Sequence, residues 1–195
     1  MPEKPKSRES ILDTASKLFF MQGYHGTGLN QIIKESHCPK GSLYYYFPEG
    51  KEELAMECIN RTKHFVSERW KELFIAVKDP SEAIQTFIES MASDAKESNF
   101  ESFMPFSFWM AVETSAISNL LRETCKSVFN EWQSIISERL QQEGIDIDRA
   151  DETAMIILSS IEGSLIHAQT LKDTKPILMA SKYVTILLNN VLVKR

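Results

Sequence analysis

The chain has 195 residues, of which 43% are hydrophobic, and a formal net charge of −5. That hydrophobic content is enough for a buried core, and only seven Gly and seven Pro leave long uninterrupted stretches that favour helices. No stretch approaches the roughly 20 consecutive apolar residues of a membrane span. The polar start MPEKPKSRES lacks the apolar core of a signal peptide. We therefore expect an all-helical cytoplasmic protein with no membrane partner.

Charge is distributed unevenly along the chain. Residues 1–64 hold nine Lys and Arg and eight Asp and Glu, which gives +1, whereas the rest holds 13 basic and 19 acidic residues, which gives −6. A near-neutral first part is compatible with local contacts to nucleic acid. It is not the strong basic field of a non-specific binder.

The first 50 residues predict three helices joined by tight turns. Residues 7–22 have an apolar face at helical spacing, and Gly23 follows where a C-terminal cap belongs. Thr27 is placed to cap a second short helix. A turn over residues 36–38 separates that helix from a third, whose first turn is favoured by Pro39.

The third helix has a composition suited to a DNA groove. Its apolar positions, Leu43 and Phe47, lie four residues apart and should face the first two helices, which leaves the tyrosines between them on exposed faces. Small residues permit a close approach to DNA, hydroxyls reach phosphates and base edges, and rings pack on sugars and thymine methyls. The alternative is that the tyrosines form a core or a protein interface in an ordinary helical hairpin. Because the core-facing positions are already occupied, DNA contact is favoured.

Two segments, ILDTASKLFFMQGYHGTGLNQIIKES and KGSLYYYFPEGKEEL, resemble the DNA-binding head of the TetR/AcrR family of bacterial transcriptional repressors. The later helices look most like the LmrA/YxaF-type branch. The resemblance implies a helix-turn-helix domain in residues 1–51 and a helical ligand-binding and dimerisation domain in residues 52–195. Carried over residue by residue, it implies DNA contacts by Thr27, Lys40, Gly41, Ser42, Tyr44, Tyr45, Tyr46 and Lys51. Lys51 would hold phosphate together with the positive end of its helix.

The chain departs from the family pattern at several positions of this head. His37 replaces a usual Gly in the turn, and His tolerates the left-handed backbone there. Gly28 stands where Thr is frequent, which removes one hydroxyl. Tyr46 stands where His is common, so the base preference is not carried over.

The remainder of the chain reads as helices over residues 52–76, 81–97, 106–114, 117–142, 151–172 and 175–193. Residues 183–192 are apolar around most of the helix circumference, so that helix needs partners on two sides. Burial within a monomer would supply them. A homodimer is favoured because the family dimerises through its last two helices, and the residues expected at the interface are Ser160, Gly163, Tyr183, Leu187 and Val191. Two-fold symmetry would present paired third helices to a palindromic operator.

A cluster of aromatic and methionine side chains follows residue 100 and exceeds what one helix face can bury. It predicts a pocket for a small hydrophobic or aromatic inducer, with ordinary core as the alternative. The pocket residues expected are Phe103, Phe106, Trp109, Met110, Glu113, Phe129, Trp132 and His167. The whole pattern predicts a ligand-responsive repressor, with activation left open.

Other classes of function have less support in the sequence. There is no glycine-rich phosphate loop, no Ser-His-Asp motif and no spaced metal-ligand pair, so we predict no enzyme, catalytic residue, metal or cofactor. Three cysteines without paired spacing argue against disulfides. Two alternatives stay open. One is a redox-responsive regulator using Cys38 or Cys58, and the other is a DNA-binding protein without a ligand, which would be expected to have a basic body.

Overall fold

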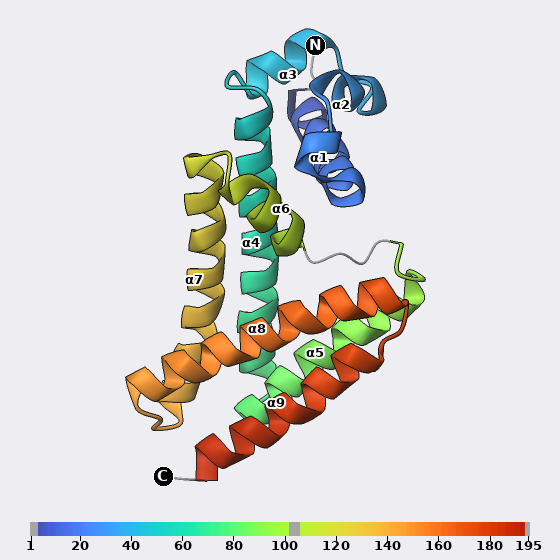
Figure 1. The fold of residues 1–195 in the computed structure, drawn as a ribbon. Coiled ribbons are helices and arrows are strands. Elements are labelled where there is room, and N and C mark those ends of the chain that lie inside the picture. The colour runs from blue at the N-terminus through green and yellow to red at the C-terminus, as the bar shows by residue number, and fades with distance from the viewer. Residues whose placement is uncertain (1–3, 102–105, 194–195) are drawn as a thin grey trace. The chain divides into compact units, whose positions relative to one another are not determined.

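The computed structural model describes residues 4–101 and 106–193, with the side chains of residues 7–101 and 111–192 (Figure 1). Nine helices and no strand form in this described part of the chain, which confirms the predicted all-α fold. The helices gather into two compact units. Unit 1 comprises Met1–Lys63 and Phe106–Val128, and unit 2 comprises His64–Pro105 and Phe129–Arg195.

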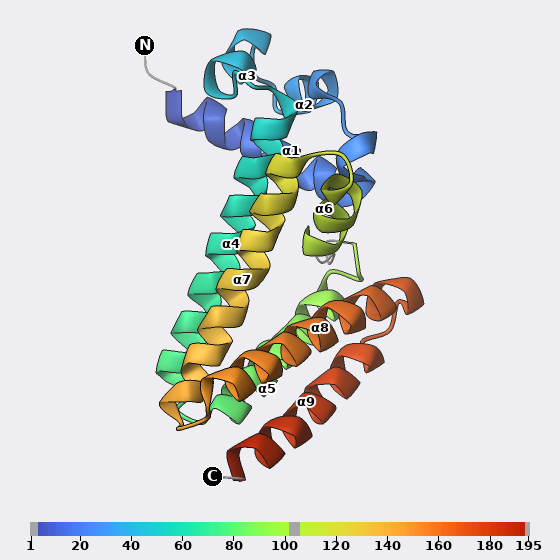
Figure 2. The same cartoon turned by 60° about the vertical axis from the view of Figure 1, so that its left-hand side comes forward.

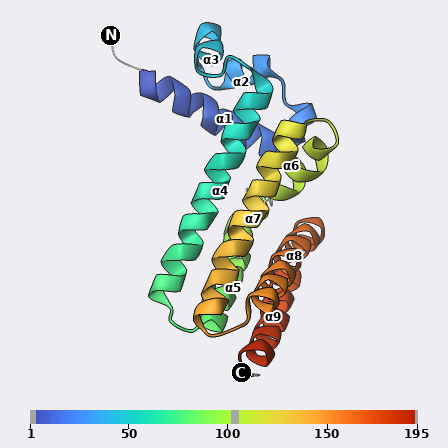
Figure 3. The same ribbon diagram turned by 90° about the vertical axis from the view of Figure 1, so that its left-hand side faces the viewer.

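Unit 1 contains the three predicted N-terminal helices and one helix from later in the chain. Figures 2 and 3 both show α2 and α3 on the same side of α1. Helix α6 also packs on α1, which explains why the compact unit extends beyond the predicted first domain. The helices of unit 1 are α1 (Lys4–Gly26), α2 (Leu29–Glu35), α3 (Lys40–Tyr46), α6 (Phe106–Ser115) and the first parts of α4 (Lys51–Ala76) and α7 (Asn119–Gln142).

The core of unit 1 follows the predicted apolar faces. Burying each large side chain of this kind stabilises the folded state by about 1.5–3 kcal/mol relative to leaving it exposed. Helices α2 and α3 are only seven residues each, too short to be stable alone, so this burial is what holds them. The fully buried large side chains are Ile11, Phe19, Ile32, Leu43, Phe47, Leu54, Ile59 and Leu121.

Unit 2 is built on three long helices that lie side by side in Figures 1 and 2: α5 (Pro80–Glu97), α8 (Ile147–Leu171) and α9 (Lys175–Val193). Helix α9 packs on both α5 and α8, so it finds two partners within its own chain. The α4 part of this unit is held by Trp70, which is buried and stacks on Phe87 of α5 with 3.6 Å between ring centroids. Helix α8 buries an aliphatic face that includes Ala154, Ile157, Leu158, Ile161 and Leu165.

The predicted helix ends are reproduced within a few residues, and the differences have local causes. Helix α5 begins at Pro80 because the Asp79 carboxylate accepts the Glu82 N–H at 2.9 Å. Helix α8 begins four residues before the predicted start because Asp146 caps it, accepting the Asp148 N–H at 3.0 Å. Among the described helices, none is long and apolar enough to cross a bilayer.

Candidate nucleic-acid interface

Helices α2 and α3 are joined by a short turn that needs one left-handed residue. His37 supplies it, with φ of 54°, as the sequence predicted. The turn is tied to α1, because the Ser10 hydroxyl donates to the Ser36 carbonyl at 3.0 Å. The α2–turn–α3 segment is therefore a helix-turn-helix fixed against α1 at its centre.

Helix α3 divides cleanly into a buried and an exposed face. Leu43 and Phe47 are fully buried, whereas Tyr44 is 44% exposed and Tyr45 is 67% exposed. Large exposed aromatics that are not needed for packing mark a contact surface. The Tyr45 ring meets the Tyr46 ring edge to face at 5.0 Å between centroids, which orients both.

The start of α3 is open and carries one positive charge. Lys40 and Gly41 are exposed, and a Cβ placed on Gly41 would meet no other atom within 4 Å. The Lys40 ammonium lies 5.9 Å from the Tyr44 ring centroid, while Ser42 is half-buried. A cation, two small residues and a helix N-terminus together can approach a phosphate closely.

Lys51 is the first residue of α4, as predicted, and so lies at the positive end of that helix. Its ammonium is 4.3 Å from the centroid of the Tyr24 ring. Burial lowers the pKa of Lys51, and the charge of Glu113 acts in the opposite direction and favours the protonated form. The side chain is half-buried, which restricts the positions that its ammonium group can take.

Thr27 does not have the capping role that the sequence predicted. The cap residue of α2 is Gly28, with no side-chain hydrogen bond, so the prediction that Thr27 caps this helix is wrong. Thr27 is 1% exposed, and its hydroxyl donates to the Gly23 carbonyl at 2.7 Å. Gly23 breaks the helical geometry of α1, and Thr27 bonds the carbonyl at that break. The contact of Thr27 with phosphate stays a prediction.

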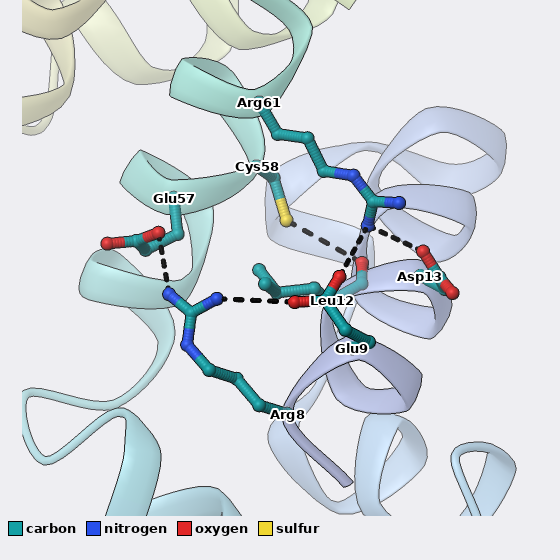
Figure 4. A network of polar contacts seen from close by, with 7 residues as sticks. All are labelled: Arg8, Glu9, Leu12, Asp13, Glu57, Cys58 and Arg61. Carbon is teal, nitrogen blue, oxygen red and sulfur yellow. Dashed lines mark hydrogen bonds and ion pairs between the residues drawn. The ribbon is translucent and has the colours of Figure 1, made fainter. Parts of the chain in front are cut away.

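Ion pairs fix the first part of α4 against α1 (Figure 4). Arg8 donates to the Glu57 carboxylate at 2.9 Å, and Arg61 donates to Asp13 at 2.5 Å. Between them Cys58 is buried, with its thiol directed at the Leu12 carbonyl. Exposed ion pairs each contribute only about 0.2–1 kcal/mol, so their main effect is to set the register of α4 on α1.

Glu113, one of the residues predicted to bind ligand, makes a contact with α1 that the sequence did not predict. Glu113 Oε2 accepts the backbone N–H of Tyr24 at 2.6 Å, which joins α6 to the end of α1. The two residues are 89 positions apart, and no spacing or motif in the sequence signals such a contact.

The other predicted pocket residues are only partly described. Phe103 lies outside the described residues, and so do the side chains of Phe106, Trp109 and Met110. Phe129 and Trp132 of α7 meet edge to face at 6.2 Å between centroids, with Trp132 buried. His167 is exposed on α8 rather than directed into the core of unit 2.

An open groove of about 600 Å³ runs between α8 and α9 in unit 2. Its lining includes Ser160 and Gly163, two of the predicted interface residues, together with His167 and Met179. Of the other predicted interface residues, Tyr183 is exposed and Leu187 is half-buried. Val191 is buried within its own unit and offers little surface to a partner.

Metal binding finds no support in the described part of the chain. No group of three or more His, Cys, Asp or Glu there is arranged to hold an ion.

Comparison with known proteins gives the same assignment for both parts of the chain. Residues 11–58 match the model of the bacterial regulatory proteins of the tetR family, and residues 80–183 match that of the transcriptional regulator LmrA/YxaF-like C-terminal domain. The HTH-type transcriptional regulator LmrA of Bacillus subtilis is 42% identical over 182 residues, which is 93% of this chain and 96% of the relative. The uncharacterized regulator YxaF of the same organism is 41% identical over 187 residues, 96% and 97% of the two chains.

Solved structures share the fold. A TetR-family transcriptional regulator from Cytophaga hutchinsonii superposes with a TM-score of 0.84 over 100% of this chain and 99% of that one, at 19% identity. The relatives and families matched are transcriptional regulators and not enzymes. The chain belongs to the TetR family of bacterial transcriptional regulators, in its LmrA/YxaF-like group.

Proposed function

We propose that the protein is a cytoplasmic repressor that binds a palindromic operator as a homodimer and is released by a small hydrophobic or aromatic molecule. The observation that carries the DNA assignment is the division of α3, in which Leu43 and Phe47 are fully buried while Tyr44 and Tyr45 are exposed. Lys40 at the start of this helix and Lys51 at the start of α4 add cations. In this proposal the lysines contact phosphates and the tyrosines contact base edges, and both come from one short segment.

The homodimer is supported by apolar surface that remains on α8 and α9. Helix α9 already has α5 and α8 as partners, yet apolar side chains on both α8 and α9 stay exposed beside the groove at Gly163. Gly163 allows another helix to approach closely, since a Cβ there would meet no atom within 4 Å. The exposed side chains are Met155, Ile156, Leu178, Met179, Tyr183 and Ile186. In a two-fold homodimer the two α3 helices would be presented to the two half-sites of the operator, which lie about 34–36 Å apart in successive major grooves.

The inducer proposal rests on composition more than on described geometry. Phe129 and Trp132 offer an aromatic pair on α7, which suits the binding of a planar or aromatic molecule. Ligand would act by population shift, binding the state whose α3 helices are mis-spaced for the operator. By linkage, DNA must then weaken ligand binding by the same factor.

Redox control through Cys58 has a physical argument against it. Burial raises the pKa of the Cys58 thiol to about 11, so the thiol is neutral at physiological pH. The thiolate is the species that reacts with oxidants, and Cys58 is shielded within unit 1. Redox control through Cys58 is therefore disfavoured.

The test is selection of binding sites from a random duplex library, followed by gel shifts on the enriched sequence and on the DNA upstream of the gene. We expect enrichment of a palindrome. Tyr45→Ala should lower affinity at least about tenfold, the loss of one to a few kcal/mol expected for a contacting ring. Phe65→Ala is the matched control, because Phe65 is 65% exposed, similar to Tyr45, but lies on α4. Equal affinity of the Tyr45→Ala protein and wild type, or no enriched sequence, would contradict the proposal.

A further inference from the structure

Glu113 of α6 contacts the end of α1 within unit 1, outside the helix-turn-helix. It is half-buried on α6, and its Oε2 accepts the Tyr24 N–H at 2.6 Å. Tyr24 follows Gly23, where α1 leaves helical geometry at φ of 77° and ψ of 173°. An amide at such a break has no helical acceptor in the usual place, so a carboxylate from another helix satisfies it.

The backbone at this point is shaped around the Glu113 carboxylate. A Cβ on Gly23 would lie 2.5 Å from Glu113 Oε1 and 2.8 Å from Oε2. Both distances are shorter than real Cβ contacts, so only glycine lets the carboxylate approach this closely. The contact is thus specific to the residue pair rather than a passing surface interaction.

The same carboxylate is coupled to the start of α4. The ring of Tyr24, whose amide Glu113 holds, lies 4.3 Å from the Lys51 ammonium. The negative charge of Glu113 also favours the charged form of Lys51. The next residue of α4, Glu52, accepts the hydroxyl of Ser118, the residue before α7. The α6–α7 segment therefore contacts the end of α1 and the start of α4 at neighbouring points within unit 1.

We propose that Glu113 is a positioning residue of the DNA-binding surface, which holds Tyr24 and, through its ring, the Lys51 ammonium in place to contact a backbone phosphate. The inference rests on the proposed operator binding and adds a residue outside the helix-turn-helix to it. Glu113 itself touches no DNA in this scheme. By holding Tyr24, it restricts the Lys51 side chain to one conformation. The entropy cost of ordering that side chain is then not incurred when DNA binds.

The experiment measures the operator dissociation constant across a range of salt concentrations for wild type, Glu113→Ala and Lys51→Ala. Each phosphate contact contributes about one to the slope of log K against log salt. We expect Glu113→Ala to lose affinity about tenfold at low salt and its slope to flatten by about one, as in Lys51→Ala. Adding Glu113→Ala to Lys51→Ala should cost little more, because both act on the same contact.

Two further variants separate positioning from charge and from stability. Glu123→Ala removes another negative charge from unit 1, but Glu123 contacts only Arg122 and Lys126 on its own helix, so it should bind DNA like wild type. Glu113→Gln retains an oxygen that can accept the Tyr24 N–H and should recover the wild-type slope. If Glu113→Ala keeps wild-type affinity, or loses affinity equally at every salt concentration, the positioning role is refuted.

A readout without DNA distinguishes failure of this inference from failure of the proposed function. The Tyr24 amide should exchange its hydrogen more rapidly in Glu113→Ala than in wild type, and Glu113→Gln should restore the protection. If wild type binds no DNA, the proposed function fails. If the Tyr24 amide exchanges its hydrogen at the same rate in Glu113→Ala as in wild type, Glu113 does not anchor Tyr24 and this inference fails.

Discussion

Replacing Gly23 with alanine should destabilise the protein by two separable effects. The first is backbone strain, because φ of 77° with ψ of 173° is a combination used almost only by glycine, which costs another residue about 1–3 kcal/mol. The second is the clash of the new Cβ with the Glu113 carboxylate, 2.5 Å away. Since the carboxylate ends a flexible side chain, it would swing aside and give up its bond to the Tyr24 N–H.

The size of the second effect follows from that hydrogen bond. A bond to a charged group contributes about 1.5–3 kcal/mol, and partial exposure of this one reduces the figure to about 1–2 kcal/mol. Gly23→Ala should therefore cost about 2–5 kcal/mol in the wild-type protein. In a Glu113→Ala background no carboxylate remains to be displaced. The same substitution should there cost about 1–2 kcal/mol less.

The assay is urea denaturation followed by far-ultraviolet circular dichroism for wild type, both single variants and the double variant. Gly144→Ala is the control, because Gly144 also has positive φ, of 84°, but a Cβ there would meet no atom within 4 Å. Its cost should be the same with and without Glu113. An equal cost of Gly23→Ala in both backgrounds would refute the reasoning, since it would mean that strain alone accounts for the loss.

Three further predictions concern other parts of the chain. Lys51→Ala should leave the melting curve unchanged while flattening the salt dependence of operator binding by about one in slope, and an unchanged slope would remove Lys51 from the interface. Because the folded pKa of Cys58 is raised to about 11 from 9.0, the folded state binds more protons than the unfolded state between these values. Stability should therefore fall as pH rises from 9 to 11, by about 2–3 kcal/mol, and Cys58→Ala should lack this component of the fall. Gly163→Arg should convert a dimer to monomers in sedimentation, whereas a dimer that survives it would place the interface elsewhere than the α8–α9 groove.

The helices and the exposed face of α3 were predictable because their signals are local. Leu43 and Phe47 lie four residues apart, so helical geometry alone places them on one face and turns Tyr44 and Tyr45 outward. The left-handed turn at His37 was also predictable, since residues of this kind tolerate positive φ. In each case the physical constraint acts within one or two helical turns of the residue it fixes.

Thr27 shows where local signals mislead. Its position before α2 and its hydroxyl are typical of a cap, but the helix begins one residue later, at Gly28. The deciding factor is the Gly23 carbonyl at the break in α1, which accepts a hydrogen bond from the Thr27 hydroxyl at 2.7 Å. The hydrogen bond to the buried Gly23 carbonyl stabilises the fold more than a helix cap would, because leaving a buried carbonyl without a donor is costly.

The site also depends on contacts that no local pattern encodes, and Glu113 is the clearest case. Its charge and its distance from the aromatic residues of 103–110 favoured a ligand contact, because sequence reasoning sees only neighbours along the chain. In the structure its carboxylate accepts the Tyr24 N–H, and the Tyr24 ring lies beside the Lys51 ammonium. Glycine at position 23 leaves room for the carboxylate, because a Cβ there would clash with it. The helix-turn-helix lies within the contiguous stretch of residues 29–46, whereas α6, which carries Glu113, begins 55 residues after Lys51. Under the proposed positioning role of Glu113, a mutation in α6 alters operator binding without changing any residue of the helix-turn-helix.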